Sequence, residues 1–509
     1  MIRLLGLLAG LSAVTDLGTG APLDEALRRC VVATRLARVL GCPDAEIREV
    51  VYASLLQHLG CTAFAHEVAG VFHDDTTAAR LSFRTDFTRP ADVWRTWVPG
   101  LVEGTSWSRA RVIATTMVGG RRVDLDGPAA TCDVARAASR RLGLPETVQG
   151  SLSAAFTMWN GRGYPRLRAQ EIPRSTRLVH VASTAVLFAD QAGNSAGISE
   201  VERRSGTYLD PELARAFTDH SGELLEGLGE LDPYQAVLDS EPDPVRLIGE
   251  EQLVEVARTF GDLVDLKSPS LHGHSAAVGD LAGAAAAKLR LADADDLGVA
   301  GYLHDLGRVG VSSRIWDKAG ALSRTERDQA RLHPYYSEQI LSGTPALTWA
   351  ARLAGQHHER CDGSGYHRGL RAAQLTMSSR VLAAADAYRS LVEGRPHRPS
   401  VPTVRAANQL RADVRAGRLD ADAVGAVLES AGHRAGTSRG RGGDLTSRQV
   451  EVLRLLAAGL SNREIARRLG ISSRTAEHHV QDCYVRIGVS TRAGAALYAM
   501  EHGLLARSG

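Results

Sequence analysis

The sequence of 509 residues is poor in lysine and holds no closely spaced pair of cysteines. Lysine occurs only as Lys267, Lys288 and Lys318, so arginine supplies nearly all of the basic charge. The six cysteines are scattered along the chain without a Cys-x-x-Cys pair. This spacing is not that of a disulfide framework, and it predicts free thiols in a reducing compartment.

The sequence also has no long hydrophobic run at its start. Residues 1–14 are apolar with one arginine, but this run is too short to span a bilayer. An export signal is the alternative, although no clear small-x-small cleavage site precedes Thr15 and Asp16. We expect instead a first helix that packs on the following domain, and therefore a cytoplasmic protein with no membrane partner.

The composition is that of an ordinary globular protein, with 44% hydrophobic and 23% charged residues. A chain of this length is too long for a single core, so three or four domains are expected. Alanine, leucine and valine recur at helical spacing, and β-branched runs bounded by turns are few. The sequence therefore predicts an all-α protein.

The charge is unevenly distributed along the chain. From residue 435 onward arginine clearly outnumbers aspartate and glutamate, so the rest of the chain is slightly acidic. A glycine-rich stretch at 435–443 can bury no apolar surface and predicts a flexible linker before this basic end. A second boundary is expected near 233–250, where proline, aspartate and glutamate interrupt two helical regions.

Histidine and aspartate recur in a specific order between residues 274 and 386. His304-Asp305 precedes Leu306-Gly307, and a His-Pro pair and a His-His pair follow before a glycine-rich loop. Imidazole and carboxylate at close quarters suit a divalent transition metal, and successive helices can aim such groups inward. His274 alone would be an ordinary core histidine. The ordered set of seven predicts a metal site: His274, His304, Asp305, His333, His357, His358 and Asp386.

This pattern resembles the HD-GYP family of bacterial metal-dependent cyclic-dinucleotide phosphodiesterases, over roughly residues 265–432. The resemblance implies two divalent transition-metal ions, iron or manganese, with Asp305 bridging them. His274 and Asp386 would complete one metal site, and His333, His357 and His358 the other. Some members hold a third metal through an acidic residue where Ser270 stands here, so two metals are expected. Such a pair lowers the pKa of a shared water and neutralises the phosphodiester oxygens of a substrate such as cyclic di-GMP.

Two positions depart from the family pattern. Arg308 stands where the family has lysine, and it is assigned catalytic and phosphate-binding roles beside the catalytic Asp305. Arginine stabilises phosphate charge but holds its proton too tightly to donate it to the leaving oxygen. His367 replaces the proline of the Gly-Tyr-Pro signature. Gly363, Gly365 and Tyr366 are expected to contact the substrate, the alternative being a purely structural turn.

The first half of the chain resembles a degenerate copy of this domain. Gln57-His58 stands where His304-Asp305 stands, Ala155-Phe156 replaces the His-His pair, and Ser183 replaces Asp386. Residues 25–27, opposite His274, include no histidine. A His73-Asp74 dipeptide falls in an inserted segment of about 45 residues, without the following pairs. We therefore expect no metal in the first copy.

The C-terminal sequence carries two helix-start signatures, Thr446-x-x-Gln449 and Ser461-x-x-Glu464. Gly470 should end the second of these helices, and Ser472 or Ser473 should begin the next. In that next helix Ala476, Val480, Cys483 and Ile487 form a core stripe opposite a polar face.

Residues 445–505 resemble the DNA-binding domain of LuxR-type transcription regulators. The resemblance implies that the polar face enters the major groove of double-stranded DNA. Arg463, Arg467 and Arg468 are placed for phosphates, and Arg474 and Gln481 for base edges. The full set of expected DNA-binding residues is Arg463, Arg467, Arg474, Thr475, Glu477, His478 and Gln481. A fourth helix, 492–505, would form a homodimer.

These observations predict five segments: a degenerate HD-GYP-like domain (1–232), a connection (233–264), an HD-GYP phosphohydrolase domain (265–432), a linker (433–444) and a four-helix LuxR-type helix-turn-helix domain (445–509). Two hypotheses remain open for the function. The chain is either a DNA-binding regulator that hydrolyses a cyclic dinucleotide, or a non-catalytic regulator whose pocket senses a nucleotide or a metal.

Overall fold

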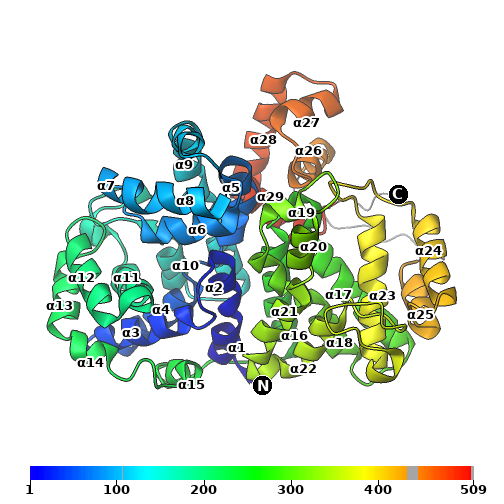
Figure 1. Ribbon diagram of the computed structural model, residues 1–509, viewed down its shortest axis with the longest axis horizontal. Coiled ribbons are helices and arrows are strands. Elements are labelled where there is room, and N and C mark those ends of the chain that lie inside the picture. The colour runs from blue at the N-terminus through cyan, green and yellow to red at the C-terminus, as the bar shows by residue number, and fades with distance from the viewer. Residues whose placement is uncertain (106, 433–444, 506–509) are drawn as a thin grey trace. The chain divides into compact units, whose positions relative to one another are not determined.

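The computed structural model describes residues 1–105, 107–432 and 445–505, and the regular secondary structure of these residues is almost all helical (Figure 1). This confirms the expected all-α class. The predicted flexible linker lies outside the described residues and stays a prediction. The chain divides into two compact units, the first formed by Met1–Gln252 with Thr344–Ala346 and the second by Leu253–Gly343 and the residues from Leu347 onward.

The first unit begins with an apolar helix whose residues are all buried, as expected for a helix that packs on its own domain. Among the described residues no helix is both long and apolar enough to cross a membrane. The elements of this unit are β1 (Ile2–Arg3), α1 (Leu4–Leu11), α2 (Ala13–Thr19), α3 (Glu25–Val39), α4 (Asp44–Leu56), η1 (Cys61–Phe64), α5 (Ala65–Phe72), α6 (Asp75–Arg84), α7 (Pro90–Asp92), η2 (Val93–Trp97), α8 (Val98–Thr105), α9 (Arg109–Arg141), α10 (Glu146–Ser153), β2 (Phe156–Thr157), β3 (Gly163–Tyr164), η3 (Ala169–Glu171), α11 (Arg174–Ala192), α12 (Asn194–Arg204), α13 (Pro211–Asp219), α14 (Ser221–Leu225), α15 (Pro233–Leu238) and β4 (Leu247–Ile248).

The second unit contains the candidate metal ligands and the C-terminal helices. Its elements are α16 (Glu250–Asp265), η4 (Pro269–Leu271), α17 (His274–Lys288), α18 (Ala294–Leu303), η5 (Leu306–Gly310), α19 (Ser313–Trp316), α20 (Arg324–Ala330), α21 (His333–Ser342), η6 (Pro345–Leu347), α22 (Thr348–Gln356), η7 (Ala372–Gln374), α23 (Met377–Val392), α24 (Thr403–Arg415), α25 (Ala421–Ser430), α26 (Ser447–Ala457), α27 (Asn462–Leu469), α28 (Ser473–Ile487) and α29 (Arg492–Glu501).

The stretch expected as a connection, 233–264, divides between the two units. Helix α15 and strand β4 belong to the first unit, where β4 pairs with β1 in antiparallel register, Ile2 opposite Ile248. Helix α16 lies almost wholly in the second unit, and Val256, Phe260 and Val264 are buried along one of its faces. This apolar stripe makes α16 a core helix of the second unit.

The same hydrogen bond joins equivalent helices in the two units. The carboxylate of Asp16 accepts the backbone N–H of Ala26 at 3.0 Å, and that of Asp265 accepts the N–H of Ser275 at 2.8 Å. In each pair the acceptor precedes the donor by ten residues. This match aligns α3 with α17, and it places Glu25 in the position that His274 holds in the second unit.

A second matched contact aligns the later helices. Arg177 of α11 forms an ion pair at 2.6 Å with Asp210, whose side chain also caps α13. Arg380 of α23 forms an ion pair at 2.9 Å with Asp420, whose side chain caps α25 in the same way. These equivalent contacts support the interpretation of the two halves as copies of one domain.

The segment inserted into the first copy forms a small helical cluster of its own. Phe72, Leu81, Trp97 and Leu101 are buried together in this cluster, with α5, α6, α8 and the start of α9 around them. Within it, the carboxylate of Asp74 accepts hydrogen bonds from the backbone and hydroxyl of Thr76 and from the hydroxyl of Thr77. Asp74 is therefore the N-cap of α6, which accounts for the His73-Asp74 dipeptide without a metal.

Candidate metal centre and DNA interface

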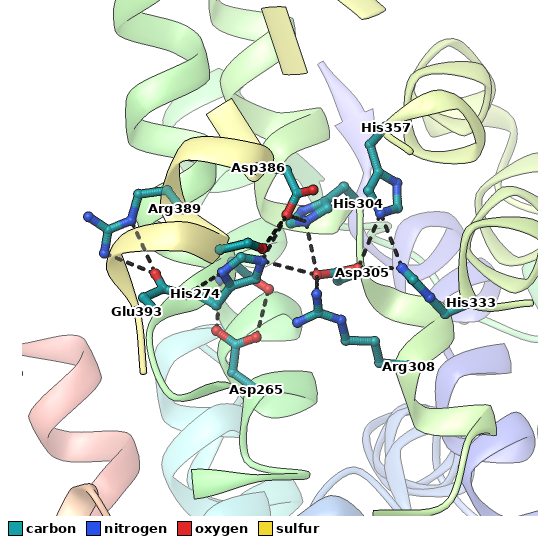
Figure 2. A network of polar contacts seen from close by, with 12 residues as sticks. Asp265, His274, His304, Asp305, Arg308, His333, His357, Asp386, Arg389 and Glu393 are labelled. Atoms are coloured by element: carbon teal, nitrogen blue, oxygen red, sulfur yellow. Dashed lines mark hydrogen bonds and ion pairs between the residues drawn. The ribbon is translucent and has the colours of Figure 1, made fainter. Parts of the chain in front are cut away.

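The seven histidine and aspartate residues singled out from the sequence come together in the second unit (Figure 2). Six of them stand at or just beyond helix ends, and Asp386 alone lies within a helix, α23. His274 begins α17, His304 and Asp305 follow α18, His333 begins α21, and His357 and His358 follow α22. Helix ends bring the backbone to the rim of the bundle core, so side chains from five helices converge on one buried point.

Asp305 lies at the centre of this group. Its Oδ2 is 2.9 Å from Nε2 of His304 and 3.4 Å from Nε2 of His274. Its Oδ1 is 3.3 Å from Nε2 of His333 and 3.5 Å from Nε2 of His357. The two oxygens of one carboxylate thus face two separate sets of imidazoles, which is the arrangement that a bridging ligand requires.

Asp386 completes one side of the centre. Its Oδ1 lies 3.3 Å from Nε2 of His274, and its Oδ2 lies 3.4 Å from Nδ1 of His358. On the other side, the Nε2 atoms of His333 and His357 are 3.2 Å apart. Within each of two groups the ligand atoms lie within 4.8 Å of one another: His274, His304 and Asp386, and His333, His357 and His358.

The donor set fits two divalent transition-metal ions. Nε2 of His274, Nε2 of His304 and both carboxylate oxygens of Asp305 are buried atoms without a hydrogen-bond partner in the protein. Nη2 of Arg308 lies 2.7 Å from Oδ2 of Asp305, but no hydrogen bond of good geometry reaches any of the four atoms. Such a group of buried polar atoms around one point indicates a ligand held there. Imidazole and carboxylate together suit iron, manganese or zinc.

Burial favours the metal-binding form of the two vicinal histidines. It lowers the pKa of His357 to about 4, and it lowers the pKa of His358 well below the ordinary value. Both imidazoles are therefore neutral near pH 7, and a neutral ring offers a lone pair to a metal. Burial alone would raise the pKa of Asp305, but Arg308 and His304 hold it well below its usual range.

From the sequence, Gly307 is expected to end the helix that precedes it, in the left-handed conformation of a C-terminal cap. Gly307 does not have that backbone, so this prediction is wrong. Helix α18 ends at Leu303, and Gly307 lies inside the 3-10 helix η5. A Cβ at this position would lie 2.1 Å from the carbonyl oxygen of His333. The backbone N–H of Gly307 also donates to the hydroxyl of Ser337 at 2.8 Å. Glycine is needed here because η5 and α21 pack backbone to backbone.

Arg308 is buried beside the centre. Its Nη2 lies 2.7 Å from Oδ2 of Asp305, and its guanidinium carbon lies 5.5 Å from the ring centre of Trp316. Nε and Nη1 of Arg308 are buried without a hydrogen-bond partner. The guanidinium therefore carries two unused donors at the metal centre, where they could meet a phosphate oxygen.

The glycine-rich loop after His358 is organised by a buried carboxylate. Glu359 accepts the backbone N–H groups of Arg368, Gly369 and Leu370 at 2.8, 3.1 and 2.8 Å. A Cβ at Gly365 would lie 2.4 Å from the Cα of Glu359, so only glycine fits at that position. Gly363 has a φ of +83°, a conformation in which other residues are strained.

Tyr366 and His367 lie at the edge of the centre. The ring of Tyr366 lies 4.7 Å from that of His358, and the guanidinium carbon of Arg331 lies 5.0 Å from its centre. His367 has its Nε2 3.7 Å from Oε2 of Glu338 and is partly buried. The loop thus places an aromatic face next to the ligand cluster, and Arg331, which follows α20, adds a cation against that face.

Two charged residues that the sequence reasoning missed also reach the centre. Oε2 of Glu393 lies 2.7 Å from Nδ1 of His274, and Figure 2 shows this contact. Arg395 contacts both Glu393 and the backbone of Ser270. Glu393 follows Asp386 by seven residues and is the first residue after α23. A carboxylate so soon after a candidate ligand was a signal that could have revealed it.

In the first unit, the position equivalent to the metal centre holds different residues. Gln57 and His58 are buried there, and burial together with Arg29 lowers the pKa of His58 well below its ordinary value. Arg29 is fully buried, with its Nε donating to the carbonyl of Ser54 at 3.0 Å and its Nη1 3.6 Å from Glu25. Among the described residues, groups able to hold a metal occur only in the second unit. A guanidinium supplies the buried positive charge in the first.

The C-terminal helices have the predicted starts and ends. Thr446 with Gln449 and Ser461 with Glu464 form capping boxes at the N-termini of α26 and α27. Gly470 ends α27 in the left-handed conformation, and the side chain of Ser472 caps α28. The fourth helix, α29, ends at Glu501, four residues earlier than expected.

One face of α28 is buried and the other is exposed. Ala476, Val480 and Cys483 are buried, whereas Ile487 is only partly so. The residues assigned to DNA are all exposed on α27 and α28: Arg463, Arg467, Arg474, Thr475, Glu477, His478 and Gln481. The second helix of the pair thus presents the polar face that a recognition helix needs.

Two families match the chain. Residues 258–423 match the family described as HD domain, and residues 444–499 match the family of bacterial regulatory proteins called luxR. The chain is therefore a fusion of an HD domain with a LuxR-type helix-turn-helix domain. The relatives of its larger part are HD-GYP cyclic-dinucleotide phosphodiesterases.

The similarity to these relatives extends beyond the HD domain. The chain is 28% identical over 408 residues to 3'3'-cGAMP-specific phosphodiesterase 3 of Vibrio cholerae, which covers 79% of this chain and 88% of that protein. It is 32% identical over 165 residues to a cyclic di-GMP phosphodiesterase of Thermotoga maritima, 32% of this chain and 45% of that one. The C-terminal 65 matched residues are 45% identical to the transcriptional regulatory protein MctR of Rhizobium johnstonii, 13% of this chain and 30% of that one.

A solved structure shares the fold. The crystal structure of a cyclic GMP-AMP-specific phosphodiesterase of V. cholerae superposes with a TM-score of 0.59 at 23% identity. The match covers 85% of this chain and 98% of the other. This chain therefore shares the fold of that phosphodiesterase structure.

Proposed function

We propose that this chain is a transcription regulator whose second HD-type domain hydrolyses a cyclic dinucleotide. The observation that carries the proposal is the position of Asp305, whose two oxygens each face a separate set of imidazoles. The relatives named as 3'3'-cGAMP and cyclic di-GMP phosphodiesterases support the same substrate class. Because the LuxR-type helix-turn-helix domain (the DNA reader) must bind chromosomal DNA, we place the protein in the bacterial cytoplasm.

The proposed centre holds two metal ions through the seven ligands. When bound, the metals would supply Lewis acidity for water activation and for charge neutralisation of the phosphodiester. The role of Asp305 is to bridge the two ligand sets, and the role of the neutral imidazoles of His357 and His358 is to donate lone pairs. Arg308 offers its two unused donors to the phosphate oxygens, and Tyr366 offers an aromatic face to a base.

Arg308 holds its proton too tightly to give it to the leaving ribose oxygen. The three lysines have other partners: Lys267 donates to the carbonyl of Val309, Lys288 pairs with Glu429 and Lys318 pairs with Glu326. We therefore expect the leaving oxygen to take its proton from water, and the rate to be modest compared with an enzyme that carries a lysine at this position.

The direct test is hydrolysis by the full-length protein loaded with Mn²⁺ or Fe²⁺. Cyclic di-GMP and 3'3'-cGAMP are offered separately, and the linear dinucleotide product is followed by chromatography. The proposal expects turnover that is abolished in Asp305→Asn and kept in Gln57→Ala, at the position of the degenerate copy that matches His304. Equal activity of the Asp305→Asn variant would refute the assignment.

A second candidate function is a non-catalytic sensor. The observation in its favour is the buried Arg308–Asp305 contact at 2.7 Å, together with the attached DNA reader. In this case the protein would hold two metals and bind the dinucleotide without cleaving it. Calorimetric binding of an intact dinucleotide, with no product after long incubation, would select the sensor over the enzyme.

A further inference from the structure

Three of the four imidazoles around Asp305 are oriented by the backbone. Nδ1 of His304 lies 2.7 Å from the carbonyl oxygen of Gly301, and Nδ1 of His333 lies 2.6 Å from that of Ala330. Nδ1 of His357 lies 2.5 Å from the carbonyl oxygen of Ala354. In each case the acceptor is three residues earlier. Donating the Nδ1–H leaves the Nε2 lone pair free, and Nε2 faces Asp305 in all three rings.

His274 cannot use this device. It is the first residue of α17 and follows Gly273, which has a left-handed φ of +78°. His333 also begins a helix, but α20 ends three residues before it and supplies the carbonyl of Ala330. The Nδ1 of His274 contacts the side chains of Glu393 and Arg395 instead. Its Nε2 nevertheless faces the centre, 3.4 Å from Asp305 and 3.3 Å from Asp386.

A carboxylate takes the place of the missing carbonyl. Oε2 of Glu393 lies 2.7 Å from Nδ1 of His274. Nη2 of Arg395 also lies near this Nδ1, at the longer distance of 3.4 Å. If Nδ1 accepted from Arg395, its lone pair would face the Glu393 oxygen at 2.7 Å, which is repulsive. Nδ1 therefore donates its proton to Glu393, which leaves Nε2, on the side of Asp305 and Asp386, as the ring atom available to a metal ion.

Glu393 is itself held in place from two sides. Its Oε1 accepts from Nε of Arg389 at 3.1 Å, and its Oε2 accepts from Nη2 of Arg395 at 3.2 Å (Figure 2 shows the Arg389 pair). Arg395 is in turn fixed by its Nη1, which donates to the carbonyl of Ser270 at 3.0 Å. Two guanidinium groups thus keep the carboxylate charged and aimed at the ring.

We propose that Glu393 is a positioning residue that fixes the tautomer and the orientation of His274 toward a metal ion. The proposal rests on the two-metal centre of the proposed function. A carboxylate carries a full negative charge, so it also makes Nε2 of His274 a stronger electron-pair donor to a metal ion than a backbone carbonyl would. Of the four imidazoles around Asp305, His274 alone receives this support from a side chain.

The degenerate copy provides a natural contrast. Asp190 follows Arg177 by thirteen residues, as Glu393 follows Arg380, so the two carboxylates hold matching positions in the sequence, Asp190 within α11 and Glu393 directly after α23. Asp190 forms an ion pair with Arg28 instead of a histidine, and the residue matching His274 is Glu25. The first copy has kept a carboxylate without an imidazole to orient, so Asp190 is the matched control.

The experiment measures Mn²⁺ binding to metal-depleted full-length protein by calorimetry, with no substrate present. Wild type is expected to bind two equivalents. Glu393→Ala should weaken one equivalent by about 10–100-fold, the range for losing an outer carboxylate of a metal-bound histidine, and leave the other unchanged. The Mn²⁺ affinity of Glu393→Gln should fall between those of wild type and Glu393→Ala, because the amide oxygen of glutamine still accepts the Nδ1–H but carries no charge. Asp190→Ala should bind Mn²⁺ as wild type does.

A double-variant cycle separates positioning from general loss of structure. If Glu393 acts through His274, the His274→Ala, Glu393→Ala double variant should bind Mn²⁺ no more weakly than His274→Ala alone. Additive losses would overturn the proposal, as would wild-type binding by Glu393→Ala. Normal Mn²⁺ binding by every Glu393 variant overturns only the role of Glu393, whereas a wild-type chain that binds no Mn²⁺ overturns the metal centre as well.

Discussion

Nη2 of Arg308 lies 2.7 Å from Oδ2 of Asp305, with both side chains buried. The guanidinium of Arg308 therefore lies against the carboxylate that contacts four of the candidate imidazole ligands. Its positive charge stabilises the ionised form of Asp305, which a metal ion needs, and its two other donors remain for a phosphate. The contact couples the metal ligands to the expected substrate.

Replacement of Arg308 should separate its charge from its shape. Arg308→Lys keeps the positive charge and adds a group that can release a proton, so we expect activity on a cyclic dinucleotide to be kept or raised. Arg308→Met removes the charge and should lower kcat by about 10²–10³-fold, the range for losing one electrostatic stabiliser. Initial rates at saturating Mn²⁺ check both. A clear fall in Arg308→Lys would mean that the fork geometry of arginine matters more than proton donation.

Removal of the shared carboxylate should empty the whole centre. Asp305 contacts imidazoles of both groups, at 2.9 Å on one side and 3.3 Å on the other. Asp305→Ala should therefore lose both metal ions rather than one. Elemental analysis of the purified variant measures this, with Gln57→Ala as the control in the first copy. Full metal content in Asp305→Ala would contradict the bridging role.

Asp16 should make the first unit less stable as pH rises. Burial raises the pKa of its carboxyl to about 8 from an ordinary 3.8, although the nearby Arg29 opposes this. Between these values the folded protein holds a proton that the unfolded chain releases. The stability present at low pH is therefore lost as pH rises toward about 8, with a slope of up to about 1.4 kcal/mol per pH unit.

The substitution Asp16→Asn tests this effect. Asparagine can still accept the N–H of Ala26 through its side-chain oxygen, but it has no charge to bury. The free energy of unfolding of the variant should exceed that of wild type by an amount that grows from pH 5.5 to pH 8.5. Urea titrations at three pH values measure the difference. Parallel pH profiles for the two proteins would show that Asp16 does not titrate in this range.

The sequence was sufficient for the class of fold, the repeat and the order of the ligand residues, because these depend on periodicity and on spacing along the chain. It was insufficient where two backbones meet. Gly307 looked like a helix cap, yet its glycine is needed for the approach of the His333 carbonyl from another helix. Glu393 was missed for a similar reason: its partner, His274, lies 119 residues away. Capping boxes were found because all their contacts are local.

Substitutions in the DNA reader should distinguish residues that contact DNA phosphates from residues that contact bases. Arg463 and Arg467 are exposed on α27, and Arg474 and Gln481 are exposed on the outer face of α28. A phosphate contact carries no base information, so Arg463→Ala should weaken binding to all duplexes about equally and lower the salt dependence by about one counterion. Gln481→Ala should instead relax sequence preference, at a cost of about 1–3 kcal/mol on the preferred site.

Selection of bound duplexes from a random pool with the full-length protein would supply the preferred site. A LuxR-type reader acting as a homodimer should select a roughly palindromic sequence, since two-fold protein symmetry sets the half-site spacing. Affinities of wild type, Arg463→Ala and Gln481→Ala for this site and for a scrambled duplex, each at several salt concentrations, then give both effects. If Gln481→Ala weakened the two duplexes equally, Gln481 would be a backbone contact, and the assignment of α28 as the base-reading helix would fail.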